Sequence, residues 1–276
     1  MKRIARVFPS LTAATPTDAL AFTGPPDASV EADEVHISVC FSWDLPEAER
    51  LEKTWRHVAP VKIGGPATGE RGDAFTPGMY LKPGYTITSR GCPNRCWFCE
   101  VPKREGNIRE LPVCAGWNVL DDNLLACSEK HIRAVFEMLN RQRRRPELTG
   151  GLEARRLQPW MVHELCRIKR KPAQIFFAYD VPDDLDPMRL AGKMLREAGM
   201  TISSRIPRCY VLCGYRGDSF DAAELRMWQT IAAGFIPMAM LYRDASGKRS
   251  RKWASFQREW ARPAIIHAKL RERGIK

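Results

Sequence analysis

The feature that most constrains the fold is a regular alternation of strand-like and helix-like segments between residues 85 and 242. Each short apolar run is followed by a stretch whose apolar residues recur at helical spacing. The strand-like segments cover residues 85–89, 117–120, 150–155, 174–180, 209–213 and 237–242. This alternation is typical of a parallel sheet with helical connections. We therefore expect an α/β fold whose strand carboxyl ends share one edge.

The connecting helices have recognisable starts. Ser128 is expected to cap the first, Pro159 to begin the second, Asp186 to open the third and Asp221 to cap the fourth. The connection before residue 116 is different, because Pro102, Gly106 and Pro112 forbid a long helix there. The first connection should therefore be irregular.

Three cysteines follow the first strand within eight residues, at Cys92, Cys96 and Cys99. Thiolates are soft ligands for zinc and iron–sulfur clusters, and three of them can hold three irons of a [4Fe-4S] cube while the fourth stays open. A closed zinc site needs a fourth ligand. Cys209 and Cys213 are the nearest second pair, but four residues of strand separate their Cα atoms by about 13 Å. One metal ion cannot bind both.

The spacing Cys-x3-Cys-x2-Cys resembles the signature of the radical S-adenosylmethionine (radical SAM) enzymes. The resemblance covers roughly residues 83–244, and it implies a partial (β/α)6 barrel with a [4Fe-4S] cluster on the three cysteines. In that family the open iron binds SAM, and an electron from the cluster cleaves SAM to a 5′-deoxyadenosyl radical that abstracts hydrogen from a substrate. The resemblance also implies that Phe98 lies near the adenine. An electron donor such as flavodoxin or ferredoxin would be a partner.

Asp121, Asp122 and Asn123 end the second strand, where radical SAM enzymes commonly carry a Gly-Gly-Glu-like motif that this sequence lacks. A carboxylate there can accept hydrogen bonds from an ammonium group. We therefore expect Asp122 and Asn123 to bind the amino group of SAM. The alternative is that they only cap the turn between strand and helix.

Glu153 and Arg155 end the third strand, and Asp180 follows the fourth. The planar fork of an arginine can pair with the SAM carboxylate, so both residues of the third strand are candidates for cofactor binding. A structural ion pair between strands is the alternative for them. Asp180 is expected to bind the ribose hydroxyls.

Residues 1–34 show no sustained helix or strand period and are predicted to form an extended arm. Residues 35–82 are predicted to form a small strand-helix-strand unit, with strands at 35–41 and 61–66 and a helix from Pro46 to about residue 57. A small α/β unit is thus expected before the cysteines.

This unit resembles a shortened form of the α/β domain that precedes the barrel in cobalamin-dependent radical SAM enzymes and methylthiotransferases. The cobalamin motif Asp-x-His-x-x-Gly is absent from it. Only Cys40 is available where a methylthiotransferase needs three thiols for a second cluster. Both activities are therefore disfavoured.

The chain carries 44 Lys and Arg against 32 Asp and Glu, a formal net charge of +12. Such an excess favours polyanionic partners, nucleic acid first among them. Residues 245–276 are predicted to form one basic amphipathic helix with aromatic residues on its inner face. Its basic residues would contact nucleic acid or form a solvated face.

Cellular location follows from what the sequence lacks. No apolar stretch is long enough to span a bilayer, and Arg6 and Pro9 interrupt the short apolar stretch near the start, so it is a poor signal peptide. Nine cysteines, an odd number, also argue against complete disulfide pairing. We expect a cytoplasmic protein with free thiols and no membrane partner.

Two functions of different classes are consistent with these features. The first is a radical SAM enzyme with an unidentified substrate, for which the net charge favours nucleic acid or a nucleotide. The alternative is a nucleic-acid-binding protein stapled by zinc or an iron–sulfur cluster, without SAM chemistry. Metal content distinguishes them, because iron and sulfide with a broad brown absorbance exclude zinc.

Overall fold

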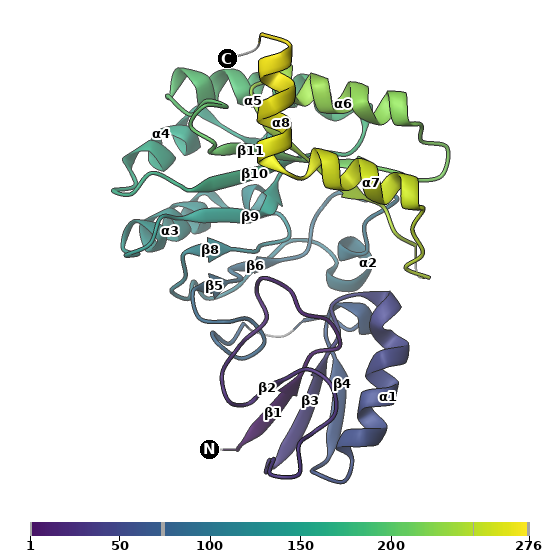
Figure 1. The fold of residues 1–276 in the computed structure, drawn as a ribbon. Coiled ribbons are helices and arrows are strands. Elements are labelled where there is room, and N and C mark those ends of the chain that lie inside the picture. Colours follow the sequence, from purple (N-terminus) through teal and green to yellow (C-terminus); the bar gives the residue numbers. More distant parts are fainter. Residues whose placement is uncertain (1, 73–74, 245, 275–276) are drawn as a thin grey trace.

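The computed structural model describes residues 2–72, 75–244 and 246–274. These residues form two parallel β-sheets with helices packed against them, and a short antiparallel ribbon (Figure 1). The α/β fold that the sequence predicts is therefore confirmed. Within the same residues, no helix has both the length and the apolar character needed to cross a membrane.

The larger sheet has six parallel strands whose order in space follows their order in the chain. They are β5 (Tyr85–Thr86), β8 (Asn118–Val119), β9 (Glu147–Leu152), β10 (Gln174–Tyr179), β11 (Pro207–Cys213) and β12 (Ile236–Leu241). Helices α3 (Glu129–Asn140), α4 (Pro159–Arg167), α5 (Leu185–Glu197) and α6 (Phe220–Ala232) connect β8 to β12 in turn. Because every pair is parallel, the strand carboxyl ends lie at one edge, as expected.

The helix starts agree with the sequence in two of four cases. The Ser128 side chain caps α3 by accepting a backbone N–H at 3.2 Å, and Pro159 begins α4. Helix α6 is capped by Ser219 instead of Asp221, because Ser219 has the extended backbone of a cap and Asp221 already lies in the first turn. Helix α5 begins at Leu185, one residue earlier than predicted, after a short 3-10 turn.

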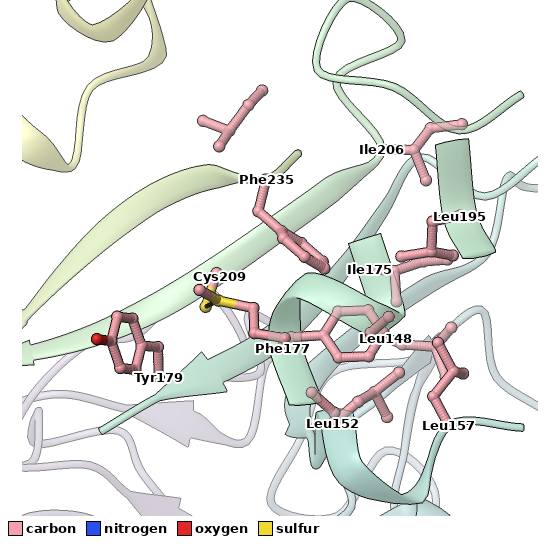
Figure 2. Close-up of a cluster of buried hydrophobic side chains, with 14 of the residues drawn as sticks. Leu148, Leu152, Leu157, Ile175, Phe177, Tyr179, Leu195, Ile206, Cys209 and Phe235 are labelled. Carbon is pink, nitrogen blue, oxygen red and sulfur yellow. Dashed lines mark hydrogen bonds between the residues drawn. The ribbon is translucent and has the colours of Figure 1, made fainter. Parts of the chain in front are cut away.

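The core of the larger sheet is apolar and includes a buried thiol. Phe177 of β10 packs against Phe235 with 5.2 Å between ring centroids. Figure 2 shows Cys209 of β11 in the same cluster. Cys209 is fully buried, and its sulfur lies 3.6 Å from that of Met188. This cysteine serves as a small apolar side chain.

The first connection is irregular, as the prolines predict. Strand β6 (Ser89–Arg90) pairs antiparallel with β7 (Arg109–Glu110), and helix α2 (Val101–Glu105) between them has only five residues. Gly106 ends this helix with a φ of +74°, a conformation that favours glycine.

The N-terminal part forms a four-stranded parallel sheet. Its order is β2 (Ala21–Phe22), β1 (Ile4–Val7), β3 (Glu34–Ser38) and β4 (Val61–Gly64), with α1 (Leu45–Trp55) connecting β3 to β4. The predicted strand-helix-strand unit is therefore present. The prediction of an extended arm over residues 1–34 is wrong, since β1 and β2 of this sheet lie in it.

The chain ends in two helices where the sequence predicts one. Helix α7 (Arg251–Trp260) packs on β12, and α8 (Pro263–Glu272) follows it. Pro263 lacks an N–H and cannot continue α7, but it is well suited to begin a new helix. Phe256 and Trp260 face inward and are buried, which agrees with the predicted amphipathic character.

Candidate functional site

The cysteine-bearing loop begins where β6 ends, and a glycine sets its direction. Gly91 has a φ of +88°, and a Cβ added to it would lie 2.3 Å from the carbonyl oxygen of Asn107. Both features require glycine. The N–H of Cys92 then donates to the carbonyl oxygen of Gly106 at 3.1 Å. The start of the loop is therefore fixed against the end of α2.

Cys92, Cys96 and Cys99 are free thiols with half-buried side chains. The N–H of Cys99 donates to the carbonyl oxygen of Cys96 at 3.1 Å, so these two residues share one turn. Burial raises the pKa of Cys96 to about 11, with further contributions from the Cys99 and Cys92 thiols. Burial likewise raises the pKa of Cys99. The three thiols thus share one neighbourhood, in which a cationic partner would be needed to form thiolates.

Two acidic residues after β8 hold the backbone around the loop. Asp121 is buried and accepts hydrogen bonds from the N–H and hydroxyl of Thr88, both at 2.6 Å, and from the Ser89 hydroxyl at 2.8 Å. Asp122 accepts the N–H of Gly91 at 2.8 Å. The contact that the structure gives Asp122 therefore positions the loop.

Asn123 lies between a cysteine and a carboxylate. Its side-chain Nδ2 donates to the Cys92 sulfur at 3.3 Å and to Glu153 Oε2 at 2.9 Å. Arg156 Nε donates to the same carboxylate oxygen at 2.6 Å. Burial alone would raise the pKa of Glu153, but the hydrogen bonds from Asn123 and Arg156 hold it below its ordinary value. An ionised carboxylate is therefore maintained beside Cys92.

Two oxygens at this point are buried without a donor. Asn123 Oδ1 and Glu153 Oε1 accept no hydrogen bond from any group in the described residues. Glu153 Oε1 has only a 3.4 Å charge contact with Arg155 Nε. A buried acceptor without a donor costs about 1–3 kcal/mol. These two oxygens are therefore suited to receive a ligand that carries N–H or O–H donors.

Arg155 and Asp180 lie at the same edge of the sheet with different surroundings. The Arg155 side chain is 49% exposed and pairs with Asp184 at 3.1 Å. This is a structural ion pair, the alternative to cofactor binding that the sequence analysis gave for Arg155. Asp180 directly follows β10. Burial raises its pKa to about 7, with the Asp184 carboxylate contributing. Asp180 is thus a carboxyl group that can be protonated near neutral pH.

Aromatic side chains gather around Trp97, the neighbour of Phe98 in the chain, and the sequence assigned them no functional role. Trp97 is 56% exposed, and its ring lies 5.4 Å from that of Phe98, 5.5 Å from that of Tyr215 and 5.6 Å from that of Tyr242. Phe98 and Tyr242 also line a cavity of about 560 Å³. Such rings offer flat apolar surfaces for stacking.

Among the described side chains, no three from His, Cys, Asp and Glu are gathered closely enough to bind one metal ion. Such a group binds a single ion, whereas a [4Fe-4S] cube attaches each thiolate to a different iron.

No protein-family model matches the chain. A search of curated proteins likewise finds no significant match.

Proposed function

We propose that the protein is a radical SAM enzyme that holds a [4Fe-4S] cluster on Cys92, Cys96 and Cys99 within a partial (β/α)6 barrel. The observation that carries this proposal is the position of the three free thiols. They come after β5, the first strand of a six-stranded parallel sheet whose spatial order is the chain order, and directly after the short strand β6. Enzymes built from such strand-helix repeats keep their chemistry at the carboxyl edge of the sheet.

The residues present suit a cluster and its SAM. Three thiolates can hold three irons of a cube and leave one iron open. Next to Cys92, the buried oxygens Asn123 Oδ1 and Glu153 Oε1 lack donors among the described residues. The ammonium group of SAM supplies three N–H donors, and hydrogen bonds that involve charged groups are the stronger kind. These oxygens therefore match the amino end of SAM.

The chain's own residues would bind and orient the cofactor. Glu153, kept ionised by Arg156, would hold the ammonium group of SAM, with Asn123 as a second acceptor. Asp180 would accept hydrogen bonds from the ribose, and Phe98 would pack on the adenine. When bound, the cluster would supply the electron that cleaves SAM to a 5′-deoxyadenosyl radical for hydrogen abstraction from the substrate.

The substrate and partners of this enzyme are proposals that depend on charge. A net charge of +12 favours nucleic acid or a nucleotide as the substrate. An electron donor such as flavodoxin or ferredoxin would reduce the cluster. An oxygen-sensitive cluster suits the reducing cytoplasm, where we propose that the protein works.

A second function is favoured by the C-terminal helices. Lys248, Arg249, Arg251 and Lys252 are exposed, and none of them forms an ion pair within the described parts of the chain. A protein stapled by zinc or an iron–sulfur cluster would use such a surface to bind nucleic acid without SAM chemistry. In that case the thiols would be structural.

The metal content of cysteine variants tests the proposal. After anaerobic reconstitution, the natural protein should bind about four irons with matching sulfide, because each of the three thiolates holds one iron of a cube. Cys92→Ala, Cys96→Ala and Cys99→Ala should each lose most of that iron. Cys166→Ala, which removes an exposed free thiol of α4, is the matched control and should keep it. Full iron in the three variants, or zinc in place of iron, would refute the assignment.

A further inference from the structure

A cavity of about 450 Å³ lies between the N-terminal sheet and the base of the cysteine loop. One wall is formed by the carboxyl ends of β3 and β4, and the opposite wall by β6 and α2. The carboxyl ends of parallel strands are where open α/β sheets bind their ligands. The volume lies in the range of small-molecule sites.

Basic side chains outnumber acidic ones around this cavity. The basic residues that line it are Lys62, Arg71, Arg90 and Arg104, and the acidic ones are Glu70 and Glu105. Lys62 already pairs with Glu34 at 3.0 Å, which leaves three arginines facing two carboxylates. The described lining is therefore positive.

The buried carboxylate of Glu105 has little capacity left for Arg90. Its side chain is 1% exposed and accepts from Arg104 Nε at 3.1 Å, Arg109 Nη2 at 3.2 Å and the N–H of Gly72 at 3.2 Å. Arg90 Nη1 approaches it only to 3.7 Å. The charge of Glu105 is thus shared among several closer donors, and Arg90 is its most distant partner.

Of the two arginines on the wall formed by β6 and α2, Arg90 is less satisfied than Arg104. Its side chain is only 19% exposed, it makes no side-chain hydrogen bond to any described residue, and its Nε is fully buried. A guanidinium carries five N–H donors in one plane, and the 3.7 Å ion pair with Glu105 gives those of Arg90 no hydrogen bond within the described residues, which is costly for a buried group. That planar fork matches the geometry of a carboxylate or a phosphate. An anion in the cavity would satisfy Arg90.

The rest of the lining indicates what such an anion carries. Ile37, Ile63 and Ile87 provide apolar surface. The ring of His36 stacks on that of Tyr80 with 6.1 Å between centroids, and a 2.6 Å hydrogen bond joins the two side chains. A ligand with an apolar or planar body would be buried against these groups.

We propose that this cavity binds a small organic anion, with a carboxylate or phosphate group on Arg90 and an apolar or planar body against β3 and β4. Arg90 stands two residues before Cys92, so the anion would contact the base of the cysteine loop. The site is separate from the strand ends that Asn123, Glu153 and Asp180 occupy. It does not depend on the cluster.

Calorimetric titration of the full chain, without reconstitution and at low salt, tests this site with two matched probe pairs. AMP is compared with adenosine, and benzoate with benzamide. We expect at least one anion to bind at least tenfold more tightly than its neutral counterpart. Binding of AMP alone would identify a phosphate site, and binding of benzoate alone a carboxylate site. No binding of either anion at millimolar concentration would overturn the proposal.

Two variants locate the binding. Arg90→Gln should weaken the binding anion at least tenfold, whereas Arg141→Gln, at an exposed arginine after α3, should leave it within twofold. Gly64 lines the cavity, and a Cβ there meets no heavy atom within 4 Å. Gly64→Leu should therefore fill the ligand's space and weaken binding, while Gly64→Ala should not. Gly64→Leu keeps every arginine, so a loss of binding in it cannot be due to a change of charge. If both Gly64→Leu and Arg90→Gln bind the anion with unchanged affinity, the anion binds elsewhere.

Discussion

Asn123 connects the two halves of the candidate site, because one side-chain nitrogen donates to both Cys92 and Glu153. The geometry also fixes which atom stays available. With Nδ2 used twice, the carbonyl oxygen Oδ1 is left buried without a donor in the described chain. The same holds for the Glu153 oxygen that Arg156 does not bind. A ligand ammonium group would supply the N–H donors that these two oxygens lack.

Gly91 offers a test of how tightly the cysteine loop is built. Gly91 and Gly217 both have a φ of +88°, but an added Cβ meets Asn107 at 2.3 Å in the first case and nothing within 4 Å in the second. Gly217→Ala therefore introduces only backbone strain, and Gly91→Ala adds a steric clash. Urea denaturation should show a free energy of unfolding about 1–3 kcal/mol lower for Gly91→Ala than for Gly217→Ala, because the clash adds the cost of overpacking to the backbone strain that both share. Equal values would mean that the loop moves freely away from Asn107.

The sequence predicted which residues share the edge but not which atoms meet. Alternating strands and helices place the residues after β8, β9 and β10 together, and Asn123 and Glu153 do touch. Asp122 instead binds the Gly91 N–H, and Arg155 pairs with Asp184. These choices depend on side-chain rotamers and on neighbours distant in sequence. No local spacing in the sequence encodes them.

Strand β1 shows why the N-terminal elements were missed. It has four residues, and the charged Arg6 in the middle breaks the apolar pattern. Arg6 is nevertheless buried, because it donates to the carbonyl oxygens of Gly78 and Met79, both at 3.0 Å, and pairs with Asp18. A buried arginine needs such partners, and those partners lie far along the chain. The six strands of the other sheet were predicted in the right order, but β9 ends at Leu152, so Glu153 and Arg155 follow this strand instead of lying in it, and β5 and β8 have only two residues each.

Glu34 makes the stability of the N-terminal sheet depend on pH. It begins β3 and receives hydrogen bonds from Lys2, Lys62 and His36, which lower its pKa from the ordinary 4.5 to about 2. A carboxyl group whose pKa is lower in the folded state stabilises the fold at pH values above its unfolded-state pKa. This stabilisation disappears as the pH falls through its folded-state pKa. The difference in free energy of unfolding between natural protein and Glu34→Gln should therefore be constant near neutral pH and vanish between about pH 5 and pH 2.

Urea denaturation across that pH range provides the measurement. Glu49→Gln is the control, because Glu49 is exposed on α1 and forms no ion pair with a described residue. The pH dependence found for Glu34→Gln is compared with that of this control. A pH-independent difference for Glu34→Gln would show that the three hydrogen bonds do not stabilise the carboxylate.

The basic residues around the start of α7 can be tested for nucleic acid contact. Each phosphate neutralised by such a residue releases counterions, so log affinity should fall with log salt by about 0.7–0.9 per contact. Replacing Lys248, Arg249, Arg251 and Lys252 together by Ser should flatten this slope. Replacing Arg50 and Lys53 of α1 and Arg56 just after it by Ser is the control and should leave the slope unchanged. A slope unaffected by the first variant would leave these residues as a solvated face.

The molecule as a whole is two parallel sheets with a cavity where they meet. The order of strands in the larger sheet follows from the alternation of strands and helices along the chain, which is why that sheet was predicted in outline. The contact between the two sheets does not follow from that alternation. It depends on side chains such as Arg104, which comes from the irregular first connection and donates to the carbonyl oxygen of Pro66, just after β4, at 3.2 Å. No periodic pattern in the sequence predicts a cavity formed in this way.

Release of 5′-deoxyadenosine from SAM tests the central claim most directly. The reconstituted protein is reduced with dithionite under anaerobic conditions, incubated with SAM without substrate, and compared with Cys96→Ala treated in the same way. If the thiols hold a cluster with one open iron beside Asn123 and Glu153, the natural protein should release 5′-deoxyadenosine slowly and SAM should change the cluster's EPR spectrum, while Cys96→Ala should do neither. A natural protein that binds iron and sulfide, yet neither cleaves SAM nor changes its spectrum with SAM, would contradict the account and make the cluster structural.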